Sequence, residues 1–244
     1  MFVIKMTKSV NPLFVRFFSS FSRFYLFNVF PKFDAQYFMA WADNQDAFEF
    51  LLKNLSLPNQ VKFAALGEKH LETLDKIGKR IWNSFCFTFE LDLNDMVLES
   101  LKKSVSMQEN YFLDSIKKQD VQQVEKYWPY TNGASKGFVE RRLINGITCC
   151  VREKESNEML GWCLMNEGSI SMLHVKEEHR GKKISKLVVI NLMERMYKKD
   201  PVLYRKAFAH VLLENEVSAN LFRSLGFREV SHVVWVAYQF ERKK

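Results

Sequence analysis

Residues 169–186 read SISMLHVKEEHRGKKISK and join three local patterns. The apolar residues of 170–175 alternate, with a slip at Leu173–His174, which predicts a strand that changes register once. A charged turn follows at 176–179. The basic stretch after it leads into apolar residues spaced as on one face of a helix over 183–198. This stretch therefore predicts a strand, a glycine-containing basic turn and the start of a helix.

Such a turn is a typical binding site for an anionic group. The first N–H groups of a helix have no partner within the helix, and the helix dipole favours negative charge there. The alternative interpretation is a solvated basic helix start without a ligand. The residues that we expect to hold the anion are Arg180, Gly181, Lys182, Lys183, Ile184 and Ser185.

Composition and charge restrict the class of protein. The chain has 244 residues, is 47% hydrophobic and contains 22 phenylalanines, which is enough to build a core, so disorder is not expected. The net charge is +8, but residues 1–33 alone carry five basic residues and no acid. The rest of the chain is therefore only weakly basic, which argues against a nucleic-acid partner.

The four cysteines, Cys86, Cys149, Cys150 and Cys163, have no spacing typical of a zinc site. We expect no metal and no disulfide framework, and we interpret the cysteines as core residues in a reducing compartment.

Residues 1–33 contain nine phenylalanines, and those from Phe14 to Phe24 recur at helical spacing. This composition resembles a mitochondrial presequence and suggests a mitochondrial protein, with a cytoplasmic one as the alternative. Equally, the segment could supply elements of a first domain, because Pro12 and Pro31 interrupt it as prolines between helices and strands of a domain do. Arg16 and Arg23 interrupt any stretch of about 20 apolar residues, so no stable membrane insertion is expected.

The order of predicted elements divides the chain into two domains. Residues 34–107 show mixed α/β character, including a predicted helix over 71–82 and a strand over 85–91. From residue 108 a second unit is expected, in which three strands (147–153, 159–165 and 170–176) form an antiparallel meander. Helices are expected over 121–128 and 136–144.

Two motifs in this second unit resemble those of the GNAT acyltransferase superfamily. Its R/Q-x-x-G-x-G/A motif is matched by Arg180, Lys183 and Ser185, with Gly181 beside the arginine. Its second motif begins with N-x-x-A/S and ends in an aromatic residue and Gly-Phe. The residues at those spacings are Asn215, Ser218, Phe222, Gly226 and Phe227.

Residues 108–244 further resemble the glycine N-acyltransferase family. The stretches GWCLM, EEHRG and HVLLENE occur in that family's order. The resemblance implies an α/β (α+β) GNAT fold, a mixed and mostly antiparallel sheet flanked by helices. It also implies a shortened, degenerate GNAT-like N-terminal domain at 1–107, with a possible targeting segment at 1–33, and a catalytic domain at 108–244.

The resemblance implies an acyl-CoA-dependent N-acyltransferase that acts on glycine or another small amino acid. Acyl-CoA is the expected co-substrate, and a small amine or amino acid is the expected partner. The pyrophosphate of acyl-CoA is expected to bind at 180–185. The pantetheine arm is expected beside the slipped strand at Leu173, His174 and Val175, and the end of the pantetheine arm is expected near Asn215 and Phe222. The alternatives are a catalytically impaired acyl-CoA-binding protein and a protein or peptide N-acetyltransferase.

The sequence departs from the family at the catalytic positions. Ser169 stands where the family's proposed general base is a glutamate, and Phe222 stands where many relatives have a proton-donating tyrosine. His210 occupies a position at which glycine N-acyltransferases also carry histidine, and a neutral imidazole suits the task of a base. We therefore expect His210 to act as the base, with Ser169 orienting a water. Glu167 and His174 remain alternatives.

Overall fold

The computed structural model describes residues 5–6, 14–18, 23–30, 34–42, 45–54, 59–128, 139–140, 143, 146–166 and 168–240. The chain forms two compact units, neither continuous in sequence. The first comprises Met1–Thr88, Val211–Glu214 and Ser231–Lys244, and the second comprises Phe89–His210 and Asn215–Val230. This division differs from the predicted contiguous domains 1–107 and 108–244, because strands β6, β11 and β12 contribute residues to both units.

The first unit contains most of the N-terminal strands. In its sheet, β1 to β5 lie side by side in sequence order and are followed by β12 and β6. From β1 to β4 each strand is antiparallel to the next, whereas β4 and β5 are parallel. The elements are β1 (Lys5–Met6), β2 (Phe14–Phe18), β3 (Arg23–Phe30), β4 (Asp34–Ala42), α1 (Gln45–Asn54), β5 (Gln60–Gly67), α2 (Leu71–Ile77), β6 (Gly78–Asp92) and β12 (Arg228–Phe240). Its core lies between the helices and the sheet, around Phe48, Phe63, Leu74 and Tyr238.

Of the two interpretations of the phenylalanine-rich segment, the structure agrees with the one in which it supplies elements of a first domain, because Phe14–Phe18 and Arg23–Phe30 form the strands β2 and β3. One sequence prediction for this unit is wrong. The helix predicted over 71–82 ends at Ile77, and β6 begins at Gly78. Gly78 has an extended backbone (φ −153°, ψ 165°), and a Cβ there would lie 2.7 Å from the Phe240 ring, so glycine is the residue that fits at this position. The mitochondrial location stays a prediction.

The second unit is built on a sheet in the order β12-β6-β11-β10-β9-β8-β7. Strands β7 (Tyr111–Asp114), β8 (Thr148–Glu153), β9 (Met159–Asn166) and β10 (Ser169–Val175) are antiparallel neighbours, which confirms the predicted meander. Strand β11 (Lys206–Leu212) joins β10 in parallel. The alternation of side chains along β8 and β9 gives the sheet two apolar faces, so both must be covered.

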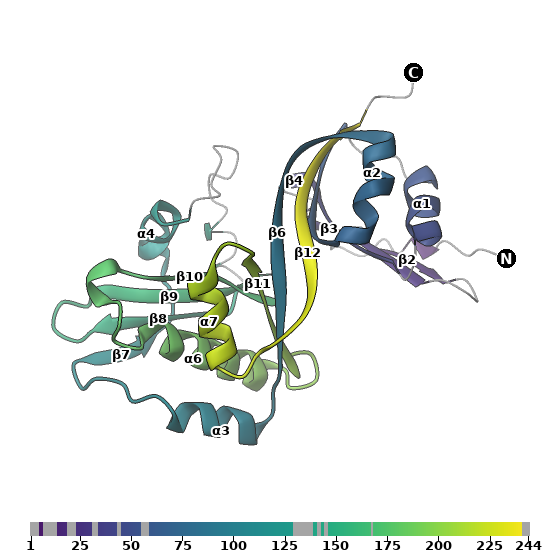
Figure 1. The fold of residues 1–244 in the computed structure, drawn as a ribbon. Helices are drawn as coiled ribbons and strands as arrows, with labels where there is room; N and C mark the ends of the chain where they lie inside the picture. The colour runs from purple at the N-terminus through teal and green to yellow at the C-terminus, as the bar shows by residue number, and fades with distance from the viewer. Residues whose placement is uncertain are drawn as a thin grey trace. The chain divides into compact units, whose positions relative to one another are not determined.

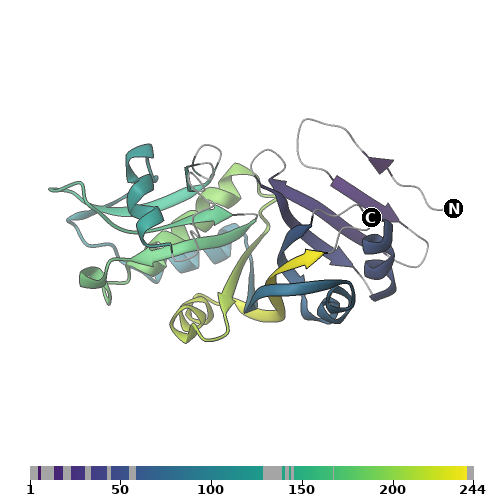
Figure 2. The ribbon, with the colours of Figure 1, turned by 90° about the horizontal axis from the view of Figure 1, so that it is seen from above.

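Helices cover both faces of this second sheet (Figures 1 and 2). Helix α4 (Val121–Lys126) lies on one face, where Val124 packs with Cys150, Trp162 and Leu164. Helix α6 (Ile184–Lys199) lies on the other face with α3 (Asp95–Lys103) beside it, and α7 (Glu216–Ser224) follows β11. The predicted helix over 136–144 falls mainly outside the described residues. No helix in the described part of the chain is long and apolar enough to cross a bilayer.

Candidate functional site

The predicted slip in the central strand is confirmed as a bulge in β10. The register with β9 shifts between Ser171 and His174, and Met172 adopts a φ of 51°. A residue other than glycine in this left-handed region costs about 1 kcal/mol or more, so the surrounding packing holds it there. Met172 itself is 4% exposed within the core on the α4 face.

The bulge coincides with the point at which two parallel strands part. The register between β10 and β11 covers Ser169 opposite Phe208 and Ile170 opposite Ala209, and no further pair within the described residues. Past the bulge, His174 and Val175 remain paired with β9 on their other side. The β11-facing edge of β10 at Leu173–Val175 is therefore unpaired in this register and is placed to offer backbone groups to an extended ligand.

The basic turn connects this parted pair to α6. Gly181 has a φ of 78°, Lys183 has a φ of 61°, and both are exposed. Ile184, at 1% exposure, anchors the start of the helix in the core. Because the first N–H groups of α6 have no partner within the helix, they point outward from this turn. Arg180 is 60% exposed, and its one ion pair with a residue that the structure describes is a long contact of 3.8 Å to Glu177, so its guanidinium is available to an anion.

A glycine in β9 allows the turn and the bulge to lie so close to the sheet. A Cβ at Gly161 would lie 2.7 Å from Ile184 Cγ2 and 3.1 Å from the carbonyl oxygen of His174 and from Val175 Cγ2. Two parts of the candidate site, the start of α6 and the bulged strand β10, therefore meet at this position. The sequence analysis did not single out Gly161, although a glycine inside a buried strand often marks a close backbone approach.

The backbone of Lys183 gives a stability prediction. Its left-handed φ is favourable only for glycine, so Lys183→Gly should be more stable than Lys183→Ala by about 1 kcal/mol. Denaturant unfolding of the two variants measures this difference. Equal stabilities would show that the turn is not held in this conformation. Lys182→Gly and Lys182→Ala form the matched control pair, because Lys182 has no positive φ.

The two predicted catalytic residues lie on the same face of the sheet. Ser169 pairs with Phe208, and His210 lies two residues further along β11, so both side chains face the α4 side. The Ser169 hydroxyl donates a hydrogen bond of 2.9 Å to the Asn166 carbonyl oxygen, which leaves its lone pairs for a water. Burial lowers the pKa of His210 to about 4, so its imidazole is neutral at pH 7.

His174, the alternative base, belongs to an aromatic cluster. Its ring lies 4.4 Å from that of Tyr127 and 4.8 Å from that of Trp162. Its Nε2 is buried and has no hydrogen-bond partner among the described residues. Burial is the main cause that lowers its pKa, and the charge of Arg180 lowers it further, while Glu178 opposes both. The other alternative, Glu167, lies outside the described residues.

The second motif has a structural role that the sequence alone did not assign. Asn215 caps α7, and its side chain accepts a hydrogen bond of 3.1 Å from the Ser218 N–H. Phe222 is 3% exposed and packs against Phe89 and Phe227, with ring centroids 6.0 and 5.1 Å away. The geometry thus gives Phe222 a packing role. Gly226 has a φ of 84° just past the end of α7, a left-handed conformation that glycine commonly adopts after a helix.

The described cysteines are all free and buried, in agreement with their interpretation as core residues. Burial raises the pKa of Cys86 and of Cys150 to about 12 and that of Cys149 to about 11. Such thiols are not nucleophilic at neutral pH. Within the described residues no group of three or more histidine, cysteine or acidic side chains is placed to hold a metal ion.

A mixed sheet with a bulged strand, a parallel neighbour that parts from it and a basic turn opening a helix together define the GNAT fold. Comparisons with known proteins agree. The model of the FR47-like protein family matches residues 149–236, which include the bulge, the turn and the second motif. A comparison of the sequence with curated proteins finds no match.

Three solved structures are similar to this chain. An X-ray structure of a Drosophila protein has a TM-score of 0.69 at 13% identity, covering 89% of this chain and 79% of that one. A tandem GNAT protein from the clavulanic acid biosynthesis pathway has a TM-score of 0.55 at 12% identity, covering 96% and 85%. A putative GNAT-family acetyltransferase from Novosphingobium aromaticivorans has a TM-score of 0.51 at 12% identity, covering 89% of each. At these identities the likeness establishes the GNAT fold.

Proposed function

We propose that the protein is an acyl-CoA-dependent N-acyltransferase that acylates the amino group of glycine or another small amino acid. The observation that carries the proposal is the parting of β10 from β11 at the bulge, directly before the basic turn of α6. Coenzyme A has an extended pantetheine arm with amide groups, which can pair with the unpaired edge of β10. The arm ends in a diphosphate, which can bind at the basic turn. The fold and the FR47-like match support the reaction class, and the sequence resemblance supports the acceptor.

In this proposal the coenzyme binds through two kinds of contact. The pyrophosphate accepts hydrogen bonds from the N–H groups of the turn 181–185, and Arg180 and Lys182 add charge-assisted contacts. The amides of the pantetheine arm pair with the free edge of β10 at Leu173–Val175, like an added strand. The thioester then reaches the face that carries Ser169 and His210.

The acceptor amine attacks the thioester carbon directly. The developing oxyanion is stabilised by backbone N–H groups of β10, and binding both substrates together supplies orientation. His210 accepts the proton released when the C–N bond forms, and a water held by Ser169 relays it. Collapse of the intermediate breaks the C–S bond, so the products are an amide and free coenzyme A thiol once the thiolate is protonated.

The direct test is the release of free thiol from acyl-CoA when an amine is added. A panel of acyl-CoAs and amino acids should give thiol and the matching amide with at least one pair. If no pair gives thiol above the background without amine, the proposed activity is wrong.

Replacing His210 by glutamine should separate its catalytic role from its structural one. As the base it contributes roughly 100-fold, so kcat should fall by about that factor while the affinity for acyl-CoA is unchanged.

The pKa of His210 is about 4 in the folded protein, below its value in the unfolded chain. The unfolded state therefore binds more protons between pH 4 and 6.5, and the free energy of unfolding should fall as pH is lowered through that range.

The pH dependence of unfolding checks the placement of His210 independently of activity. His210→Gln should show a shallower fall of stability between pH 6.5 and 4 than the wild type. The pKa of His174 is also lowered, so part of the slope should remain. An unchanged slope would contradict the lowered pKa of His210. An unchanged kcat would show that another group is the base.

A second candidate function is acyl-CoA binding without transfer. It is favoured by Ser169 in place of a carboxylate and by Phe222, which is packed in the core and has no hydroxyl to donate. In that case acyl-CoA should raise the melting temperature, because a ligand of the native state stabilises it, while no amine releases thiol.

A further inference from the structure

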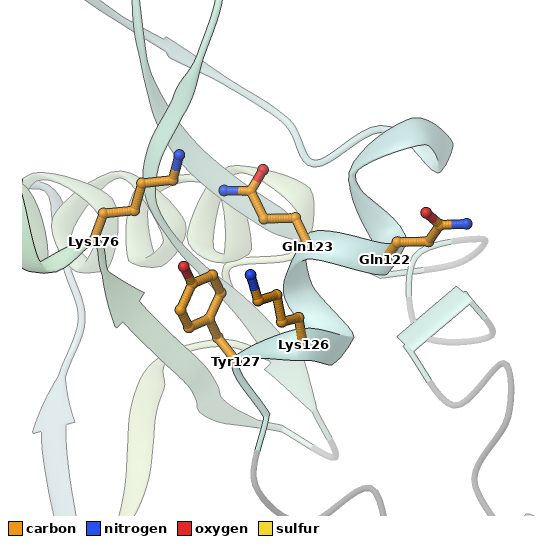
Figure 3. A pocket seen from close by; sticks show the side chains of 5 residues that line it. All are labelled: Gln122, Gln123, Lys126, Tyr127 and Lys176. Carbon is orange, nitrogen blue, oxygen red and sulfur yellow. The ribbon is translucent and has the colours of Figure 1, made fainter.

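An open surface pocket, termed the cavity, lies at the end of α4, on the face of the sheet that carries Ser169 and His210, and the side chains that line it carry polar groups. Its volume is about 320 Å³ and its lining consists of Gln122, Gln123, Lys126, Tyr127 and Lys176. Figure 3 shows the ammonium groups of both lysines, the Gln123 amide and the Tyr127 hydroxyl gathered around one space. Every one of these groups can donate a hydrogen bond, and none of the lining residues is acidic.

The lysines differ in how their charge is balanced. Lys176 forms an ion pair with Glu158, whose pKa is lowered mainly by that hydrogen bond. Lys126 forms no ion pair with any described residue and lies 5.6 Å from the centre of the Tyr127 ring. The side chain of Gln123 is held in place because its Nε2 donates a hydrogen bond of 3.1 Å to the Met159 carbonyl oxygen. The cavity therefore has one unbalanced cation beside an oriented amide.

The wall of the cavity continues into the bulged strand. Tyr127, which lines the cavity, stacks on His174, and the buried Nε2 of His174 has no partner among the described residues. Lys176 directly follows β10 and precedes the turn that carries Arg180. A group bound in the cavity would thus lie next to the path proposed for acyl-CoA, but separate from the N–H groups at the start of α6.

We propose that this cavity is a second oxyanion site, in which Lys126, Gln123 and Tyr127 bind a carboxylate or phosphate group of a substrate. The proposal rests on the proposed function, because that function supplies two sources of such a group. One is the carboxylate of the amino-acid acceptor, and the other is the 3′-phosphate of coenzyme A. A carboxylate and a phosphate are both bound by a cation together with neutral hydrogen-bond donors. The lining supplies the cation as Lys126 and the neutral donors as Gln123 and Tyr127.

The test compares the wild type with Lys126→Gln, which removes the charge and keeps a polar side chain of similar length. Lys103→Gln is the matched control, because Lys103 is an exposed lysine of α3 in the same unit. If the 3′-phosphate is the ligand, Lys126→Gln should bind coenzyme A about tenfold more weakly and dephospho-coenzyme A unchanged. Titration calorimetry with both coenzymes measures this.

If the acceptor carboxylate is the ligand, the same variant should bind both coenzymes normally. The KM for glycine should then rise about tenfold, while the KM for glycinamide, which has the amine without the carboxylate, should not change. Lys103→Gln should change neither quantity. A Lys126→Gln variant that matches the wild type in coenzyme affinity and in both KM values overturns the proposal.

One further measurement keeps the cavity separate from the proposed reaction. Inorganic phosphate or acetate should shift the NMR signals of the Tyr127 ring in the wild type and not in Lys126→Gln. If the anions produce this Lys126-dependent shift while no acyl-CoA and amine pair releases thiol, the oxyanion site stands and the proposed function fails. The absence of a shift with either anion counts against the site even if the enzyme is active.

Discussion

Replacing Gly161 by alanine should lower the affinity for acyl-CoA at least tenfold and destabilise the protein by about 1–3 kcal/mol. The added methyl group would lie 2.7 Å from Ile184 Cγ2 and 3.1 Å from the His174 carbonyl oxygen. The first contact moves the start of α6 and the second moves the bulged strand. Because the pyrophosphate and the pantetheine arm are each proposed to bind one of these parts, a small displacement should affect both contacts.

Titration calorimetry with acyl-CoA and denaturant unfolding measure the two effects of Gly161→Ala. The control is Gly67→Ala in the first unit, where the nearest contact of an added Cβ is an ordinary 3.6 Å to the His70 ring. That variant should bind and unfold like the wild type. If Gly161→Ala is destabilised but binds acyl-CoA normally, the proposed coenzyme site is misplaced.

Replacing Arg152 by methionine should lower the free energy of unfolding by about 3–5 kcal/mol. Its side chain is 2% exposed, and its guanidinium donates to the carboxylates of Asp114 (2.9 Å) and Asp120 and to the Asn157 carbonyl oxygen (3.2 Å). The carboxylate of Asp120, the residue directly before α4, also accepts a hydrogen bond of 2.7 Å from the Lys117 N–H. Removal of the arginine would therefore leave a buried carboxylate unbalanced and loosen the segment that carries Tyr127 and the cavity.

Denaturant unfolding at neutral pH measures the loss, and Arg228→Met is the control. Arg228 is 67% exposed and contacts Glu90 and Asp92 at 3.2 and 3.3 Å, so its loss should cost less than about 1 kcal/mol. If Arg152→Met does not fold, Arg152→Lys keeps the charge without the forked donors and should be intermediate. A loss for Arg152→Met no larger than that for Arg228→Met would contradict the buried ion pair.

The ion pair between Arg152 and Asp114 also makes the free energy of unfolding depend on pH, with a defined sign. Burial raises the pKa of Asp114, but Lys117, the Ser115 N–H and Arg152 together hold it below its ordinary value. A carboxylate with a depressed pKa stabilises the fold above its unfolded pKa, and this stabilisation is lost as pH falls through the folded pKa. The difference between the wild type and Arg152→Met should therefore shrink below about pH 4.

Local patterns were sufficient to predict the meander, the bulge and the helix α6 of the second unit, but not the limits of that unit. The alternation in 147–176 predicts the meander, and the interruption at Leu173–His174 marks the bulge, because both depend on neighbouring residues in one strand. The basic turn and the helix over 183–198 were predicted for the same reason. Spacing failed at Gly78, where β6 begins although the helical periodicity continues to residue 82, because the strands with which β6 pairs, β12 and β11, are distant in the chain.

The sequence alone predicted the elements around the turn at 180–185, where we propose that an anion binds, since strand, turn and helix are contiguous there. Only the tertiary structure showed that β10 and β11 part after Ile170 and Ala209, and that Ser169 and His210 share a face. It also brought Lys126, Tyr127 and Lys176 around one cavity and placed Gly161 against Ile184. These relations join residues far apart in the chain, and only the packing of side chains between separate strands and helices specifies such distances.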